Sequence, residues 1–174
     1  GKSSTVEIDN QVYILTACLD AKKEKLALRI IANGFNYEKT LKLLNTRIRT
    51  KLREVAVTKS LDANALIVTA LNAKQDPELF IKIRGRDNFV FVGDSKVPFS
   101  NVNFDLRIEC IAQKNKEPEM SNAKIFIDGL SGHIYSVPFT AKALIENLRD
   151  PRLLVQCKLK GDGQQINNSL PIDL

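Results

Sequence analysis

The fold expected from this sequence is decided by residues 37–57, YEKTLKLLNTRIRTKLREVAV. Apolar residues recur in this stretch every three or four positions, the spacing that places side chains on one face of an α-helix. Asn36 stands immediately before it, where its side chain can accept a hydrogen bond from a free amide of the first turn. We therefore predict a helix over residues 37–57, with a buried stripe formed by Leu41, Leu44, Ile48, Leu52 and Val55.

A second helix is expected just before this one. Asp20 is a suitable N-cap for a helix that begins near Ala21. Gly34 is a suitable stop, because glycine after the last turn takes a positive φ without steric cost. The break at residues 34–36 then makes the two helices a helical hairpin. The apolar positions of the earlier helix are Leu26, Ala27, Ile30 and Ile31.

The rest of the chain favours β-structure. Residues 6–19 predict a β-hairpin, because two apolar runs flank Asp9-Asn10, a pair that tolerates the left-handed conformation of a tight turn. After residue 59 the apolar period falls to about two. A short helix is expected over residues 141–148, before Asp150-Pro151. Strands are expected over residues 65–71, 79–84, 88–92, 103–112, 123–128, 132–137 and 153–159, with turns at Gly85-Arg86-Asp87 and Asp128-Gly129.

These elements predict an α+β protein. An N-terminal β-hairpin and a basic helical hairpin, residues 1–59, would pack on a C-terminal antiparallel sheet or small β-sandwich, residues 60–174, in one compact unit. A chain of 174 residues, 44% of them hydrophobic, is long and apolar enough to bury a core.

The formal net charge of +6 is concentrated in the predicted helical hairpin. Residues 22–59 hold eleven Lys and Arg against three Glu, whereas residues 60–174 hold 14 basic and 14 acidic residues. A cationic helix face of this kind either binds a polyanion or confers solubility. The candidate binding residues are those that gather on one flank and the outer surface of the helix over residues 37–57: Lys39, Lys42, Arg49 and Arg53.

The expected function is that of a noncatalytic binding or assembly module. Its basic helix would meet an acidic protein surface, another anionic surface or a second copy of the chain. The alternative is a nucleic-acid-binding protein that uses the same helix face for nonspecific phosphate contact. Residues 28–44 resemble the opening of a helix-turn-helix motif, but the predicted second helix runs on where such motifs turn again. Single-strand binding needs exposed aromatic residues, and the strand pattern predicts core positions for most of Phe89, Phe91, Phe126 and Tyr135.

Catalysis is not expected. His133 is the only histidine, and it follows Gly132 in a predicted turn. A cysteine-dependent enzyme that pairs His133 with Cys18, Cys110 or Cys157 is the third class of function considered. Cys110 and Cys157 fall on the apolar sides of their predicted strands, where cysteine packs as a small hydrophobe. No metal-ligand spacing and no phosphate-binding glycine loop is present, so no metal or cofactor is expected.

The location of the protein is constrained only loosely. Three widely spaced cysteines, an odd number, favour a reducing compartment such as the cytoplasm. A signal or anchor preceding residue 1 would instead indicate the cell envelope. No apolar run approaches the roughly 20 residues that a membrane-spanning helix needs.

Overall fold

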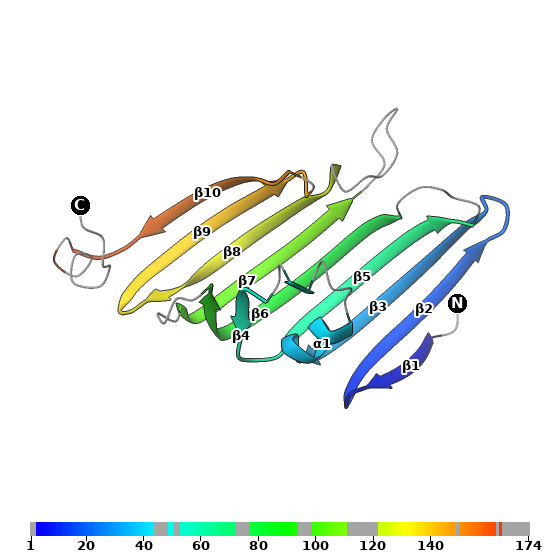
Figure 1. Ribbon diagram of the computed structural model, residues 1–174, viewed down its shortest axis with the longest axis horizontal. Helices are drawn as coiled ribbons and strands as arrows, with labels where there is room; N and C mark the ends of the chain where they lie inside the picture. Colours follow the sequence, from blue (N-terminus) through cyan, green and yellow to red (C-terminus); the bar gives the residue numbers. More distant parts are fainter. Residues whose placement is uncertain are drawn as a thin grey trace.

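The protein is almost entirely one antiparallel β-sheet (Figure 1). The structure is a computed structural model, and the part of the chain that it describes comprises residues 3–43, 49–50, 53–71, 77–93, 99–110, 122–148, 150–162 and 164. Its elements are β1 (Ser3–Ile8), β2 (Gln11–Asp20), β3 (Lys25–Phe35), α1 (Tyr37–Leu43), β4 (Val55–Val57), β5 (Leu61–Ala70), β6 (Glu78–Val92), β7 (Phe99–Cys110), β8 (Lys124–Ile134), β9 (Val137–Glu146) and β10 (Arg152–Leu159).

The strands follow one another in space nearly as they do along the chain. The order across the sheet is β1-β2-β3-β5-β6-β7-β8-β9-β10, and each neighbouring pair is antiparallel. The short strand β4 lies off this path and pairs with the last residues of β6, whereas β5 pairs with the first residues of β6. The outermost strands of the sheet are therefore β1 and β10.

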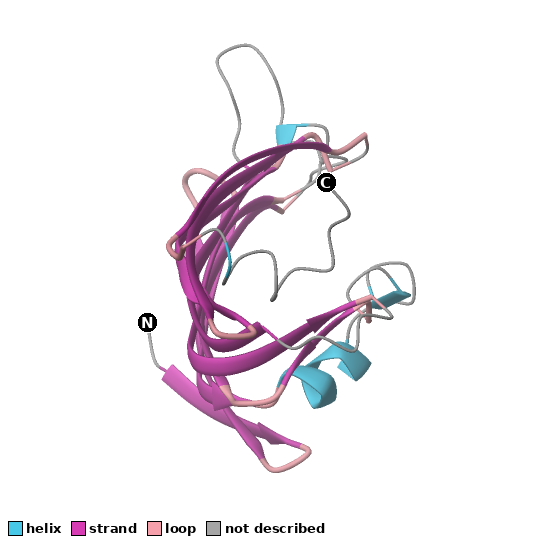
Figure 2. Ribbon diagram, turned by 90° about the vertical axis from the view of Figure 1, so that its left-hand side faces the viewer, coloured by secondary structure: helices cyan, strands magenta, loops and turns pink. Residues whose placement is uncertain are grey.

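The sheet curves, so that it has a concave and a convex face (Figure 2). Register shifts interrupt the pairing of β6 with β7, of β7 with β8 and of β8 with β9. Bulges of this kind bend and twist the strands that carry them. The helix α1 lies on the concave side, where its Tyr37 packs against the cluster of Ala32, Phe35 and Leu61.

The predicted α+β class is wrong, because the basic helical hairpin does not exist. Of the helix expected over residues 37–57, the described residues show α1 and a helical conformation at residues 49–50, whereas residues 55–57 are the strand β4. Residues 44–48 and 51–52 lie outside the described part of the chain. The N-cap was predicted correctly, since the backbone amide of Lys39 donates to Asn36 Oδ1 at 3.0 Å.

The earlier helix of the expected hairpin is also absent. Its residues form β3 and the tight turn that joins β2 to β3. Asp20 does accept hydrogen bonds from backbone amides, those of Lys22 and Lys23 at 3.1 Å, but it does so in this turn. Gly34 does adopt a positive φ of 69°, at a register shift between β3 and β5. The resemblance of residues 28–44 to a helix-turn-helix is thereby excluded, because β3 occupies residues 25–35.

Two predicted hairpins and the last predicted helix are wrong as well. Residues 79–84 and 88–92 belong to the single strand β6, which is bulged, not turned, at Gly85-Arg86-Asp87. Residues 123–128 and 132–137 likewise do not form a hairpin, because residues 124–134 are one long strand, β8, which continues through Gly129 before the turn into β9. Residues 141–148 are largely the end of β9. The β1–β2 hairpin and the strand over residues 153–159 are confirmed, and Asp9 and Asn10 have the expected positive φ of 52° and 60°.

Burial is concentrated at the end of the sheet that carries α1 and β4. Asn88 is fully buried there, where its Oδ1 accepts from the Lys59 amide at 2.7 Å and its Nδ2 donates to the Arg86 carbonyl at 3.2 Å. The first of these bonds fastens the segment after β4 to β6, and the second lies within β6. Over most of the sheet, by contrast, the aliphatic side chains are only half-buried.

Candidate functional site

The most distinctive surface of the molecule is the concave face of the sheet. The strand register aligns one aliphatic side chain from each of eight strands into a central row: Leu15, Ile30, Ala65, Ile81, Ile108, Ile125, Ile145 and Leu153. The next row toward α1 consists of Tyr13, Ala32, Ala63, Ile83, Leu106, Ile127, Ala143 and Val155. We call these two rows the apolar trough. Neither row contains a charged side chain.

The apolar trough is poorly covered by the described residues. No member of the central row is buried; seven are half-buried and Leu153 is 61% exposed. The chain as a whole exposes 12154 Å², whereas a compact protein of this mass exposes about 8500 Å². A single-layer sheet contributes to this difference, because a sheet normally buries its apolar face against a second layer.

One end of the apolar trough is closed by α1. Tyr13 and Tyr37 both pack against the cluster of Ala32, Phe35 and Leu61. The Tyr13 hydroxyl lies 3.3 Å from the Thr40 hydroxyl of α1, so that strand and helix also share a hydrogen bond. Burial raises the pKa of the Tyr37 hydroxyl above its ordinary value. The trough is thus lined at this end by aromatic side chains and aliphatic ones elsewhere.

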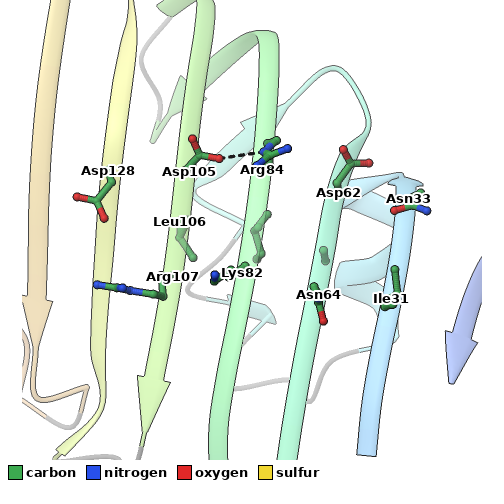
Figure 3. A pocket seen from close by; sticks show the side chains of 12 residues that line it. Ile31, Asn33, Asp62, Asn64, Lys82, Arg84, Asp105, Leu106, Arg107 and Asp128 are labelled. Carbon is green, nitrogen blue, oxygen red and sulfur yellow. Dashed lines mark hydrogen bonds and ion pairs between the residues drawn. The ribbon is translucent and has the colours of Figure 1, made fainter. Parts of the chain in front are cut away.

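The opposite face of the sheet carries the charged side chains of the central strands, around a shallow depression of about 520 Å³ (Figure 3). Asp62, Arg84, Asp105 and Asp128 project into it from four neighbouring strands, and the register places them in one row. Arg84 Nε donates to Asp105 Oδ1 at 3.1 Å, and Arg86 Nη2 donates to both Asp105 oxygens at 3.0 Å. Within this row, Arg84 and Asp105 therefore satisfy one another's charge, together with Arg86.

The ionisation of Asp105 reflects these contacts. Partial desolvation acts to raise the pKa of its carboxyl, but the hydrogen bonds from Arg84 and Arg86 and their positive charges outweigh it. The net effect is a pKa below the ordinary value for aspartate. Both oxygens of this carboxylate already accept hydrogen bonds from the two arginines, and its lowered pKa keeps it ionised. These properties argue against a role as a general acid or base.

The four basic residues expected to form a binding face are not presented by one helix. Lys39 and Lys42 are exposed on α1, and Lys39 Nζ donates to the Asp9 carbonyl at 3.1 Å. Arg49 is half-buried. Arg53 is exposed in a turn, and its backbone amide donates to the Arg49 carbonyl. Other cations of the same charged segment, Lys22 and Lys23, lie in the β2–β3 turn, at the opposite end of β3 from α1.

The structure does not bring a cysteine and His133 together. His133 lies within β8 rather than in a turn, half-buried and paired with Ser100 of β7. Cys110 is at the far end of β7, ten residues from Ser100 or about 33 Å along the strand. Cys110 is buried as expected, but Cys157 is exposed, contrary to its predicted packing; none of the three cysteines forms a disulfide. Among the described residues, no three His, Cys, Asp or Glu side chains group as metal ligands would.

The aromatic residues are less buried than expected. Phe89, within β6, is 42% exposed, and Tyr135, in the turn between β8 and β9, is 49% exposed. Phe126 is half-buried on the convex face beneath the Arg107 guanidinium, whose carbon lies 4.4 Å from the ring centroid. These rings lie on β6, β8 and the β8–β9 turn, without forming one stacking surface with Lys39 and Lys42 of α1.

Sequence reasoning missed the apolar trough, although part of its signal was present. The alternation of residues 103–112 correctly placed Leu106, Ile108 and Cys110 on one side of a strand. The pattern does not say whether a second layer covers that side. The pattern alone therefore favours a core, whereas the exposed row depends on the register that aligns the strands.

The fold and its two faces define a class: a curved, single-layer antiparallel sheet with one apolar and one polar surface. Comparisons of this chain with models of known families, with curated proteins and with solved structures found no match. Within the described residues, no helix has the length and apolar character required to cross a bilayer.

Proposed function

We propose that the protein is a noncatalytic binding module that holds an elongated apolar ligand, such as the acyl chain of a fatty acid or phospholipid, in the apolar trough. The central row of the trough carries this proposal, because eight neighbouring strands each present an uncharged side chain that stays partly exposed, and Leu153 at its edge is 61% exposed. Each methylene moved from water into such surroundings gains about 0.8 kcal/mol.

The curvature of the sheet favours a flexible chain over a flat protein surface. Two sheets pack face to face at about 10 Å when their surfaces follow one another. A concave face (Figure 2) would meet a flat partner mainly along its rims. The central row crosses eight strands, a span of about 34 Å, whereas an acyl chain that fills one bilayer leaflet is about 15 Å long. One such chain therefore fits within the trough.

In this proposal, the anionic group of the ligand lies at the α1 end of the trough. Lys39 and Lys42 are exposed on α1, which packs at this end. A carboxylate or phosphate headgroup positioned there would be attracted by both ammonium groups, with an energy that falls as salt is added. The alternative proposal, nonspecific contact with nucleic acid phosphates, uses the same lysines together with Arg53.

Titration with a fluorescent long-chain fatty acid tests the proposal. Ile81→Asp and Ile108→Asp each place a carboxylate in the central row, and we expect affinity to fall at least tenfold. The matched control is Lys82→Asp, because Lys82 is the next residue along β6 and lies on the polar face. Far-UV circular dichroism establishes that each variant keeps its sheet.

Two results would contradict the proposal: no binding by the wild-type protein, or an equal loss of affinity in Lys82→Asp. The nucleic acid alternative is tested separately by gel shift with generic DNA and RNA. Retention that is abolished by Lys39→Glu, Lys42→Glu and Arg53→Glu together, without fatty acid binding, would favour that alternative.

A further inference from the structure

The two edge strands of the sheet carry opposite charges. Among the described residues, β1 and the turn that follows it contain Glu7 and Asp9 and no Lys or Arg. The opposite edge, β10 with the residue after it, contains Arg152, Lys158 and Lys160 and no Asp or Glu. Charged residues on an edge strand normally prevent pairing with another sheet. Here the acidic β1 edge repels the β1 edge of another copy and attracts its basic β10 edge.

The β10 edge is also unusually apolar for an exposed strand. All eight of its residues are exposed, including Leu153 at 61%, Leu154 at 60% and Val155 at 54%. Along its outer side, no described residue pairs with its backbone amides and carbonyls. A long, exposed, apolar edge is a template for the addition of a further strand.

We propose that β10 of one copy of this chain pairs with β1 of a second copy, so that the molecules associate head to tail. The strands on the path from β1 to β10 number nine and alternate in direction, so the two edges run parallel to each other. A second copy whose concave face lies on the same side therefore meets β10 through a parallel β1. Parallel pairing is slightly weaker per residue than antiparallel pairing, which makes the complementary charges important.

One register satisfies both faces of the joined sheet. With Glu7 beside Lys158, the convex face gains an ion pair, and Asp9 falls beside Lys160. The same register places Ile8 beside Leu159 and Ser4 beside Val155 on the concave face. The side chains of Glu7 and Lys158 lie on the same face, because the register of the sheet connects both to the convex rows. The apolar trough would then continue from one copy to the next, whether or not a lipid occupies it.

Charge variants give a direct test of this pairing. The wild-type protein should show an average mass, by sedimentation velocity, that increases with concentration and decreases with salt. Glu7→Lys and Lys158→Glu should each weaken association at least tenfold, because each places like charges side by side. The double variant Glu7→Lys/Lys158→Glu restores an opposite pair and should restore association. Lys142→Glu, the same charge change one strand inward on β9, should have little effect.

A cross-linking measurement identifies which edges meet. The register places Val6 of one copy beside Cys157 of the next, and Cys157 is exposed. In a Cys18→Ser background, Val6→Cys should form disulfide-linked dimers, trimers and higher species on mild oxidation. The proposal is overturned by a wild-type monomer at every concentration, by a double variant that fails to recover, or by an oxidised series that ends at a Cys157–Cys157 dimer.

Discussion

Asp105 is the residue at which charge and stability are most clearly linked. Because its pKa in the folded state lies below the ordinary value, its ionised form stabilises the fold at pH values above about 4. This contribution is lost as the pH falls through the lowered value. The side chain is 51% exposed, so solvent screening limits the contribution to less than about 1 kcal/mol.

Asp105→Asn is therefore expected to lower the free energy of unfolding by a constant amount between about pH 5 and 7 and by progressively less below about pH 4. Urea denaturation at a series of pH values measures this difference. Asp128→Asn removes the neighbouring carboxylate of the same row and serves as the control. A difference that does not change with pH, or one that the control reproduces, would show that the arginine contacts do not stabilise the fold.

For single residues, the sequence predicted hydrogen bonds between neighbouring residues better than it predicted the helix or strand that contains them. Asn36 accepts a backbone hydrogen bond at a helix start as predicted, whereas Asp20 accepts two in a turn instead of at a helix start; such bonds span only two or three residues. Asn88 went unnoticed. Its burial depends on the segment after β4, about thirty residues earlier, which no local pattern connects to β6. Similarly, the candidate residues Lys39 and Arg53 were placed on one helix because only their mutual spacing was visible.

Among the elements, β6 depends most on one residue without a side chain. Gly85 lies at the bulge of β6, and a Cβ atom there would come within 2.4 Å of the Phe104 ring. Phe104 packs against the Ala32–Phe35–Leu61 cluster, so the ring cannot move away without disturbing that core. Gly85→Ala is expected to cost about 1–3 kcal/mol of unfolding free energy, the typical cost of overpacking.

A double-mutant cycle tests that expectation. Phe104→Leu shortens the side chain that the new methyl group would meet, so Gly85→Ala should cost much less in the Phe104→Leu background. Thermal or denaturant unfolding of the four proteins measures the coupling. Additive effects of the two substitutions would mean that the bulge, rather than the contact with Phe104, requires glycine.

The helices were mispredicted for an identifiable reason. In β3, Leu26 and Ile30 point to the concave face, whereas Ala27 and Ile31 point to the convex face. Apolar residues on both faces of a strand can produce the spacing of an amphipathic helix. In residues 55–57 the outcome is set by pairing with residues 90–92, which overrides local helix propensity. The strand over residues 153–159 was predicted correctly, because it alternates and needs only its neighbour β9.

For the whole molecule, the strand order was within reach of the sequence, but its single layer was not. Short turns between successive strands favour neighbouring positions in a sheet, as observed for all strands except β4. The expected sandwich assumed that each apolar strand face meets a second layer. The described residues supply such a layer only at the α1 end. The net charge of the chain likewise suggested one cationic surface, whereas folding separates the β2–β3 turn from α1.

This single layer has a thermodynamic consequence. The heat-capacity increase on unfolding reflects apolar surface newly exposed to water and is about 2–2.6 kcal/mol/K for a compact protein of this length. Because most side chains of the apolar trough are already partly exposed to water in the folded chain, we expect a value below about 2 kcal/mol/K by scanning calorimetry. Saturation with a long-chain fatty acid should raise both this value and the melting temperature, since the ligand binds only the folded form. Ile81→Asp should remove the ligand effect while leaving the low heat-capacity change of the ligand-free chain. A ligand-free value equal to that of a compact protein would mean that the trough is covered in solution.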